Sequence, residues 1–310
     1  MRSAPLTFLL LLLCYLPAGN AAEYTLKRAE QTIVIDTHFL FSDKRDQAIV
    51  SWIESVTSAL ASVYGRWPRD ELRVEVSPIG VRTDDPVPWA QVERGQPDTV
   101  SFYIDALASP DKLVNNWTAY HEFSHLLIPY RGWGDMWFSE GLASYYQNLL
   151  QARHGIFSQQ EMWDRLHAGF MRGRNTNKLP ELSLGELSEQ MHESRSYMRV
   201  YWSGAWYFLT ADVELRRRSN NQQSLDTALE SLNRCCAEDS LSAREIAMQL
   251  DRLSEQALFV PLFDKVAASQ AIPAFEPLFQ QLGIEVINDG VLLLDNAEEI
   301  GIRDAIGRQM

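Results

Sequence analysis

Residues 118–127 read Thr-Ala-Tyr-His-Glu-Phe-Ser-His-Leu-Leu. If the two histidines in this segment bind a metal, the remainder of the chain has to supply a further ligand. Residues four apart lie on the same face of a helix, so His121 and His125 can present two imidazole nitrogens to one zinc ion. Glu122, directly after the first histidine, would reach toward a water molecule on that ion and act as a general base. The pattern also arises by chance on solvated helices. The apolar neighbours favour a buried helix, in which such polar groups need partners.

A second segment supplies a third candidate ligand. Residues 137–146 read Trp-Phe-Ser-Glu-Gly-Leu-Ala-Ser-Tyr-Tyr, which places Glu140 in the first turn of an otherwise apolar helix. An exposed acid at this position would only complement the helix dipole. The aromatic neighbours favour burial, and two histidines with one glutamate would leave an open zinc position for water, as in catalytic sites. Ser144, one turn further on, is either a hydrogen-bonding support for the ligands or, as we favour, a small packing residue.

Alternating apolar and polar residues predict three strands in the first third of the chain, at 32–39, 72–76 and 99–104. Between the first two strands, Ser42 is expected to cap a helix whose apolar residues share one face, and Pro68 follows where that helix must have ended. This part of the chain is therefore expected to form a small sheet that carries one helix.

Beyond Asp111 the apolar period becomes helical, most clearly over residues 117–127, 137–150 and 197–217. Near the end of the chain, two apolar runs flank Asn288-Asp-Gly290, which is a strong hairpin signal. The second part of the chain is therefore expected to be mainly α-helical and to close with two short strands.

These patterns predict four segments. Residues 1–21 combine an early arginine, a short apolar run and small residues near their end, which is typical of a secretory signal peptide. The apolar run is shorter than the ~20 residues of a spanning helix, so no stable membrane span is expected after cleavage. The remaining segments are an N-terminal α/β lobe at 22–108, a helical lobe with the zinc motif at 109–282, and a C-terminal hairpin and tail at 283–310. The signal predicts a periplasmic or secreted protein.

Composition excludes some classes of partner. The chain of 310 residues is 46% hydrophobic and 22% charged, which is typical of an ordinary globular protein. Its formal net charge of −13 makes nucleic acid an unsuitable partner, because the phosphate backbone would be repelled. The sequence does not indicate the oligomeric state.

Cysteine is rare in the chain. Cys14 lies in the expected signal peptide, which leaves the adjacent pair Cys235 and Cys236. There is no disulfide framework and no thiolate zinc motif. In an oxidising compartment the pair could form a strained vicinal disulfide or cross-link two chains. We favour the simpler interpretation, two small unbonded side chains at a helix end.

Three motifs together resemble the gluzincin metallopeptidases, and most of all the glycyl aminopeptidase family, which is related to the aminopeptidase N family. They are the His-Glu-x-x-His helix, the Trp-Phe-x-Glu-Gly segment at 137–141, and Tyr201-x-x-Gly204 with Asp212 and Arg216 downstream. The resemblance implies an α+β fold, a thermolysin-like catalytic domain in which a small β-sheet lobe and a mainly α-helical lobe hold the zinc site between them. It also implies that Tyr201 donates a hydrogen bond to the oxyanion formed on the scissile carbonyl. Tyr197 and Tyr207 are weaker candidates for this role.

One departure from the family pattern bears on specificity. Related enzymes carry a glycine-rich segment with an acid before the zinc helix, which lines the substrate and helps to hold a free amino terminus. The nearest stretch here is residues 88–95, where Glu93 stands without the glycines. The choice between aminopeptidase and endopeptidase action therefore stays open.

The resulting expectation is zinc-dependent hydrolysis of peptide bonds by a metal-activated water, with a peptide or protein as substrate. The strand at 99–104, just before the zinc helix, is expected to be an edge strand along which an extended peptide docks. Two other classes stay open: a non-catalytic envelope binding protein stapled by zinc, and a zinc hydrolase that acts on a non-peptide amide or ester. A structural site usually closes its fourth metal position with a protein ligand, so Glu122 beside an open position favours catalysis.

Overall fold

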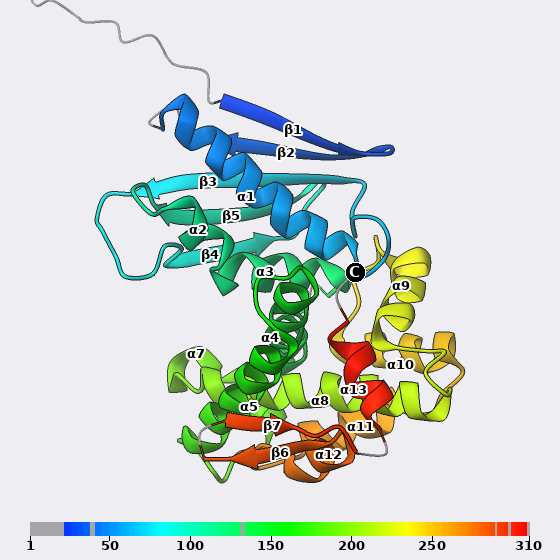
Figure 1. Cartoon of the computed structure of the whole chain (residues 1–310). Helices are drawn as coiled ribbons and strands as arrows, with labels where there is room; N and C mark the ends of the chain where they lie inside the picture. The colour runs from blue at the N-terminus through cyan, green and yellow to red at the C-terminus, as the bar shows by residue number, and fades with distance from the viewer. Residues whose placement is uncertain are drawn as a thin grey trace, which may run out of the picture.

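The computed structural model describes residues 22–37, 41–130, 132, 134–288, 290–296 and 299–308. The expected signal peptide, 1–21, lies outside the described residues. A β-sheet with helices on one face forms one part of the molecule, and a helical region lies directly below it in Figure 1. The chain is thus mixed α and β. As the sequence predicts, the strands of the sheet come from the first third of the chain and most of the helices from the remainder.

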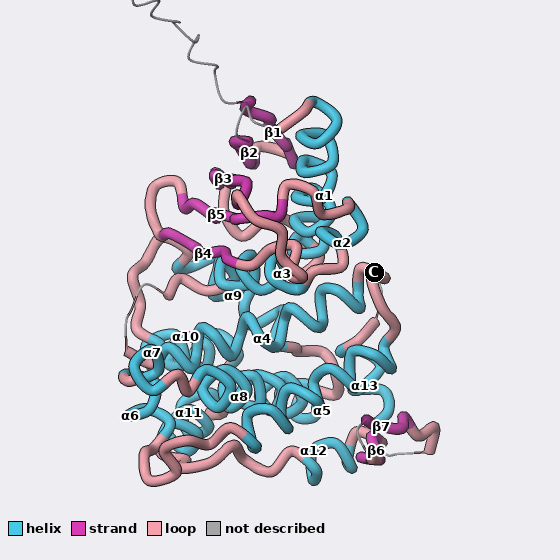
Figure 2. The backbone as a smooth tube through the Cα atoms, turned by 90° about the vertical axis from the view of Figure 1, so that its left-hand side faces the viewer, coloured by secondary structure: helices cyan, strands magenta, loops and turns pink. Residues whose placement is uncertain are grey.

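The sheet has five strands in the order β1-β2-β3-β5-β4. Their bounds are β1 (Ala22–Arg28), β2 (Gln31–Thr37), β3 (Glu71–Ile79), β4 (Trp89–Glu93) and β5 (Asp98–Asp105). The inner strands β2, β3 and β5 run parallel, and the edge strands β1 and β4 pair antiparallel to their neighbours. Alternate residues of the inner strands, such as Ile35, Val74 and Phe102, are fully buried. They pack under α1 (Asp43–Ala61), which crosses one face of the sheet (Figures 1 and 2).

The predicted strand at 99–104 is confirmed as part of β5, but the expectation that it forms an edge is wrong. β5 lies between β3 and β4, and the edge strand is β4. None of the β4 side chains is fully buried, so this strand lacks the apolar alternation by which the others are recognised. The exposed edge strand β1 escaped prediction for the same reason.

Most of the chain after β5 is helical. The helices are α2 (Pro110–Val114), α3 (Trp117–Ser124), α4 (Met136–Arg153), α5 (Gln159–Asn175), α6 (Leu184–Glu189), α7 (Met191–Ser194), α8 (Tyr197–Arg218), α9 (Leu225–Cys236), α10 (Ala243–Ser254), α11 (Phe259–Ala267), α12 (Glu276–Gln281) and α13 (Ile300–Ile306), with a short 3₁₀ turn at His125–Leu127. The predicted hairpin is confirmed as β6 (Ile284–Ile287) and β7 (Gly290–Leu293). In the described part of the chain, no helix has the length and apolarity that crossing a membrane requires.

α4 is the central helix. Every residue from Trp137 to Arg153 is buried, which is typical of a helix that other elements surround on all sides. α3 packs between the sheet and α4, and α5 and α8 lie on the far side of α4 (Figure 2). Polar groups on α4 therefore need internal partners. The hydroxyl of Tyr145, for example, donates a 3.0 Å hydrogen bond to Asp212, which forms a buried 2.9 Å ion pair with Arg216.

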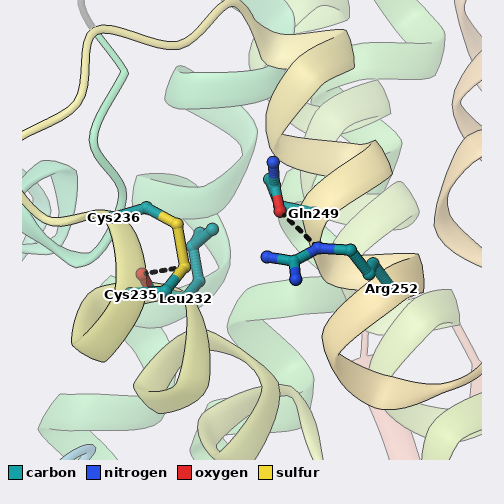
Figure 3. Close-up of a disulfide and its surroundings, with 5 residues drawn as sticks. All are labelled: Leu232, Cys235, Cys236, Gln249 and Arg252. Carbon is teal, nitrogen blue, oxygen red and sulfur yellow. Dashed lines mark hydrogen bonds between the residues drawn. A yellow bond between two sulfur atoms is a disulfide. The ribbon is translucent and has the colours of Figure 1, made fainter.

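Cys235 and Cys236 form a disulfide at the end of α9 (Figure 3). The preference for two unbonded side chains is therefore wrong. The pair lies against the last turn of its own helix, where Cys235 Sγ is 3.3 Å from the carbonyl oxygen of Leu232. Five residues after the disulfide, the backbone N–H of Leu241 donates to the carbonyl oxygen of Pro129, in the loop that follows the two predicted histidine ligands.

Candidate metal centre

α3 carries His121 and leads directly into the 3₁₀ turn that carries His125, and this segment is fixed at both ends. Asn116 caps its first turn by accepting a 2.9 Å hydrogen bond from the N–H of Thr118, and the Asn116 amide donates to Asp85. After Ser124 the helix tightens into the 3₁₀ turn that begins with His125. The guanidinium of Arg94 donates to the carbonyl oxygens of His125 and Ile128, and so ties this turn to the end of β4.

His121, His125 and Glu140 converge on one point. One ligand atom from each lies within 4.8 Å of the other two. Nε2 of His121 is 3.1 Å from Oε2 of Glu140, and Nε2 of His125 is 3.9 Å from the same oxygen. Ligand atoms that each lie about 2.0–2.1 Å from one zinc ion are separated from one another by distances similar to these two. The side chains at these three positions thus have the chemistry and spacing of a divalent-metal site with two nitrogen donors and one oxygen donor.

The outer ring nitrogens of both histidines have partners on α4. Nδ1 of His121 lies 2.8 Å from Oε1 of Gln147, and Nδ1 of His125 lies 2.9 Å from Oγ of Ser139. With the Gln147 oxygen as acceptor, His121 carries a proton on Nδ1, so its Nε2 would be the atom that donates a lone pair to a bound metal. Such partners fix both the orientation and the tautomer of metal-ligating histidines.

The electrostatics also suit a cation. Burial lowers the pKa of His125 to about 3, so this imidazole is neutral and able to donate its lone pair. Burial alone would raise the pKa of Glu140, but its interactions with the neighbouring imidazoles and its hydrogen bonds to His121 and Tyr201 lower that pKa, so the carboxylate is ionised. For His121, burial opposes protonation, but the hydrogen bond and charge of Glu140 outweigh it and raise the pKa, so a proton occupies this imidazole until a metal replaces it. A buried carboxylate between two imidazoles therefore has positive charge as its natural complement.

Glu122 lies beside this centre, on the same helix as the two histidines. Burial raises the pKa of its carboxyl group to about 7, with His121 opposing the shift. A carboxyl group that titrates near neutral pH can both accept and release a proton, which is what a general acid–base catalyst requires. Glu122 thus adds to the three candidate ligands a buried acid that can be either protonated or ionised near neutral pH.

Tyr201 approaches the centre from α8. Its ring stacks on that of His121, with centroids 5.9 Å apart, and its hydroxyl hydrogen-bonds to Glu140. Burial raises the pKa of this phenol, so it stays protonated and can donate. The weaker candidates point elsewhere: the hydroxyl of Tyr207 donates to the carbonyl oxygen of Phe259, and Tyr197 contacts His192 and the edge of the Tyr201 ring.

The backbones of α4 and α8 touch at two glycines, Gly141 and Gly204. A Cβ atom on Gly204 would overlap the carbonyl oxygen of Trp137 and would lie 2.7 Å from the Cα of Gly141. Only glycine permits this approach. Gly141 directly follows Glu140, and Gly204 lies one turn after Tyr201, so the contact sets the spacing between the third candidate ligand and the tyrosine.

Sequence reasoning missed the two α4 residues that hold the histidines. Gln147 lies seven residues after Glu140 and therefore on the same helix face, so helical spacing could have pointed to it. Ser139 directly precedes Glu140, and adjacent helix residues do not share a face, so the spacing gave no signal for it. For Ser144 the sequence left two roles open, support for the ligands and, as favoured, simple packing. Ser144 lines the cavity beside His121, and among the described residues its side chain makes no hydrogen bond to the three candidate ligands.

Comparison with known proteins supports the resemblance that the motifs indicate. Residues 132–229 match the family model of the M61 glycyl aminopeptidases, so the similarity to that family is confirmed over this part of the chain. This match includes Glu140, Gln147 and Tyr201 but not the α3 histidines. No curated protein sequence matches the chain.

Solved structures show the fold. An aminopeptidase N family protein from Idiomarina loihiensis is 13% identical, with a TM-score of 0.60 over 86% of this chain and 50% of its own. A mutant M1 zinc metallopeptidase from Deinococcus radiodurans, bound to a Tyr-Ser-Ala substrate, is 14% identical, with a TM-score of 0.53 over 82% and 53%. The yeast LTA4 hydrolase is 12% identical, with a TM-score of 0.54 over 79% and 38%. The chain thus has the fold of a part of these proteins and spans about half the length of the first two.

Replacing Gly204 by alanine is expected to separate α4 from α8, because the added methyl group has no space. Overpacking of this kind costs about 1–3 kcal/mol of unfolding free energy, which urea denaturation would measure. Metal affinity, measured by competition with a chromophoric chelator, should fall as well. Glu140 directly precedes Gly141, so a shift of α4 at this contact displaces Glu140 from the two histidines.

The matched control is Gly185→Ala in α6, where the added Cβ would meet its nearest neighbour at 3.7 Å, an ordinary contact distance. That variant should keep the parental stability and metal affinity. Parental stability in the Gly204→Ala protein would contradict the close contact described here.

Proposed function

We propose that this protein is a zinc-dependent peptidase. The observation that carries the proposal is the convergence of His121, His125 and Glu140 on one point, with Glu122 and Tyr201 beside it. The family match to the M61 glycyl aminopeptidases and the fold shared with M1 zinc metallopeptidases support peptide hydrolysis. The two-nitrogen, one-oxygen donor set is typical of catalytic rather than structural zinc sites.

In this proposal the two Nε2 atoms and the Glu140 carboxylate hold the zinc ion. Zinc, when bound, acidifies a water molecule to a pKa of about 7 and polarises a carbonyl group. The surrounding protein supplies the remaining chemistry. Gln147 and Ser139 hold the imidazoles in the donating orientation, and the burial of the site strengthens each electrostatic interaction within it.

Glu122 is proposed as the general base. It accepts a proton from the attacking water and later delivers it to the nitrogen of the departing amine, so that a single carboxyl group serves both half-reactions. Its pKa of about 7 suits both roles. Tyr201 is proposed to donate a hydrogen bond to the carbonyl oxygen as negative charge develops there, an interaction that can be worth a few kcal/mol in the transition state.

The thermolysin-like arrangement belongs to the same proposal, with the sheet lobe at 22–108 and the helical lobe at 109–282 on either side of the site. The edge strand β4 packs on α3 and has one free side for an extended peptide to pair with. Glu93 ends this strand and is the acid nearest the docking edge in sequence. Whether the enzyme removes terminal residues or cuts internally depends on how this edge holds a free amino group.

Glu122→Gln should keep the zinc and lose hydrolysis, because the amide preserves shape and cannot accept the proton. Mass-spectrometric mapping of cuts in a mixed peptide library should show chelator-sensitive cleavage by the parent and a loss of at least ~10²-fold in the variant. Elemental analysis of both proteins provides the control.

The outcomes separate the alternatives. Bound zinc without turnover in the parent would favour a zinc-stapled binding protein, and activity confined to small esters or non-peptide amides would favour another hydrolase. Comparable turnover in parent and variant would remove Glu122 from the mechanism. The positions of the cuts distinguish exopeptidase from endopeptidase action.

Gln147→Ala is expected to weaken zinc binding by about 10–100-fold, because the His121 ring loses the partner that fixes its tautomer. Competition titration against a chelator measures the loss. Gln151→Ala, one turn further along α4, is a suitable control: Gln151 is buried like Gln147 but donates to the carbonyl oxygen of Asn115 rather than to a ligand. Equal zinc affinities in the two variants would remove Gln147 from the site.

We also propose that the protein is exported and acts in the periplasm or outside the cell. The signal-like residues 1–21 support export, and the Cys235–Cys236 disulfide fits an oxidising compartment. Amino-terminal sequencing of protein recovered from the envelope or culture medium should give a start near Ala21 or Ala22. Recovery of the chain from the cytoplasm with residues 1–21 still attached would refute this proposal.

A further inference from the structure

A cavity of about 350 Å³ opens beside the candidate metal centre. His121 and Tyr201 are among the residues that line it, and Trp117, Met198 and Trp202 give it aromatic and apolar walls. Any group bound in this cavity would therefore adjoin the atoms that react in the proposed function. The inference that follows rests on that function and concerns the class of substrate it takes.

α5 forms one wall of the cavity, and two glycines on this helix allow another wall residue, Trp202, to approach it closely. A Cβ on Gly169 would run into the indole ring of Trp202, and one on Gly173 would lie 2.9 Å from the Cβ of the same residue. The two glycines let Trp202, on α8, lie directly against α5. The buried Trp202 ring is thereby a fixed surface of the cavity rather than a mobile side chain.

The same face of α5 brings two arginines to the cavity. Arg165, Ala168 and Arg172 follow at helical spacing, and all three line it. The positive charge of Arg165 is already matched, because its guanidinium pairs with Glu161 at 2.7 Å and lies over the ring of Phe157. Arg172 differs: its guanidinium carbon lies 5.1 Å from the Trp202 ring centroid, and no acid of the described residues pairs with it.

Of the two arginines that line the cavity, Arg172 is thus the one whose charge no described acid offsets. The formal net charge of the chain is −13, so this guanidinium is a local exception to a field that otherwise repels anions. A guanidinium held against an aromatic face still has its N–H groups available, and a carboxylate is the partner they fit best. Gln147 and Asn148 add polar groups to the cavity lining.

We infer that this cavity binds a substrate residue that carries a carboxylate, next to the bond that is cut, with Arg172 as the residue that determines specificity. The aliphatic part of that residue would lie along Trp202, and its carboxylate would reach the Arg172 guanidinium. The carboxylate has two possible sources: the side chain of an aspartate or glutamate, or the free carboxyl terminus of a short peptide.

Binding to the Glu122→Gln protein loaded with zinc tests the inference without relying on turnover. The first probes for calorimetry are hexapeptide amides of alanine in which one residue is replaced by glutamate, at a different position in each peptide. For every such peptide, a second one carries glutamine at the same position. Alanine tripeptides are added as free acids and as amides. The glutamate series reports a side-chain carboxylate, and the tripeptides report a terminal one.

Either the glutamate peptides should bind about tenfold more tightly than their glutamine counterparts, or the free-acid tripeptides about tenfold more tightly than the amides. This is the amount expected for a charge-assisted hydrogen bond. Arg172→Gln should abolish the preference, and Arg172→Lys should keep part of it because the charge remains. Arg244→Gln is the matched control, since Arg244 is exposed on α10, pairs with Asp264 and is not among the residues that line the cavity. Circular dichroism checks that each variant is folded.

Equal affinity for the charged and neutral peptides in the Glu122→Gln protein would overturn the inference, as would a preference that survives Arg172→Gln. If instead the proposed function is wrong and the inference about the cavity is right, the result is different from both of these. A protein that binds the carboxylate peptides selectively but, with Glu122 intact, cleaves no peptide would refute the function and leave the assignment of the cavity standing.

Discussion

The contact between the α4 and α8 backbones is the constraint on which the candidate site depends. Gly141 and Gly204 meet without side chains between them, so the two helices are closer than ordinary packing allows. Glu140 and Tyr201 each lie close in sequence to one of these glycines, and both reach the point that His121 and His125 define from α3. Three separate helices therefore contribute to one site, and the glycines fix the distance between two of them.

The same arrangement places charge in the interior, where the candidate ligands and the charged groups along α4 have partners. Glu140 lies between the imidazoles, and Gln147 and Ser139 satisfy the outer ring nitrogens. Farther along the fully buried α4, Tyr145 donates to Asp212, which in turn pairs with Arg216. A polar group without a partner would be costly at these depths. The central helix thus holds both the ligand supports and the contacts that anchor it to α8.

The sequence allowed the candidate site to be located more reliably than its surroundings. The spacing of His121 and His125 and the apolar helix around Glu140 are short-range patterns, and the structure brings the three side chains together. β4 could not be predicted, because an exposed edge strand carries no apolar alternation. The histidine partners are visible only once α3 and α4 are packed, since Gln147 could equally have faced another neighbour. The vicinal disulfide ran against expectation, because cysteines so close in sequence rarely reach bonding geometry.

The Cys235–Cys236 bond also differs from most disulfides in what it can do for the fold. A cross-link stabilises a protein mainly by restricting the unfolded chain, and the effect grows with the length of the loop that it closes. Neighbouring residues enclose almost no loop, so this bond removes little entropy from the unfolded ensemble. The architecture is therefore sustained by its helix packing and its sheet, and reduction of the sulfurs would leave the global folding equilibrium nearly unchanged.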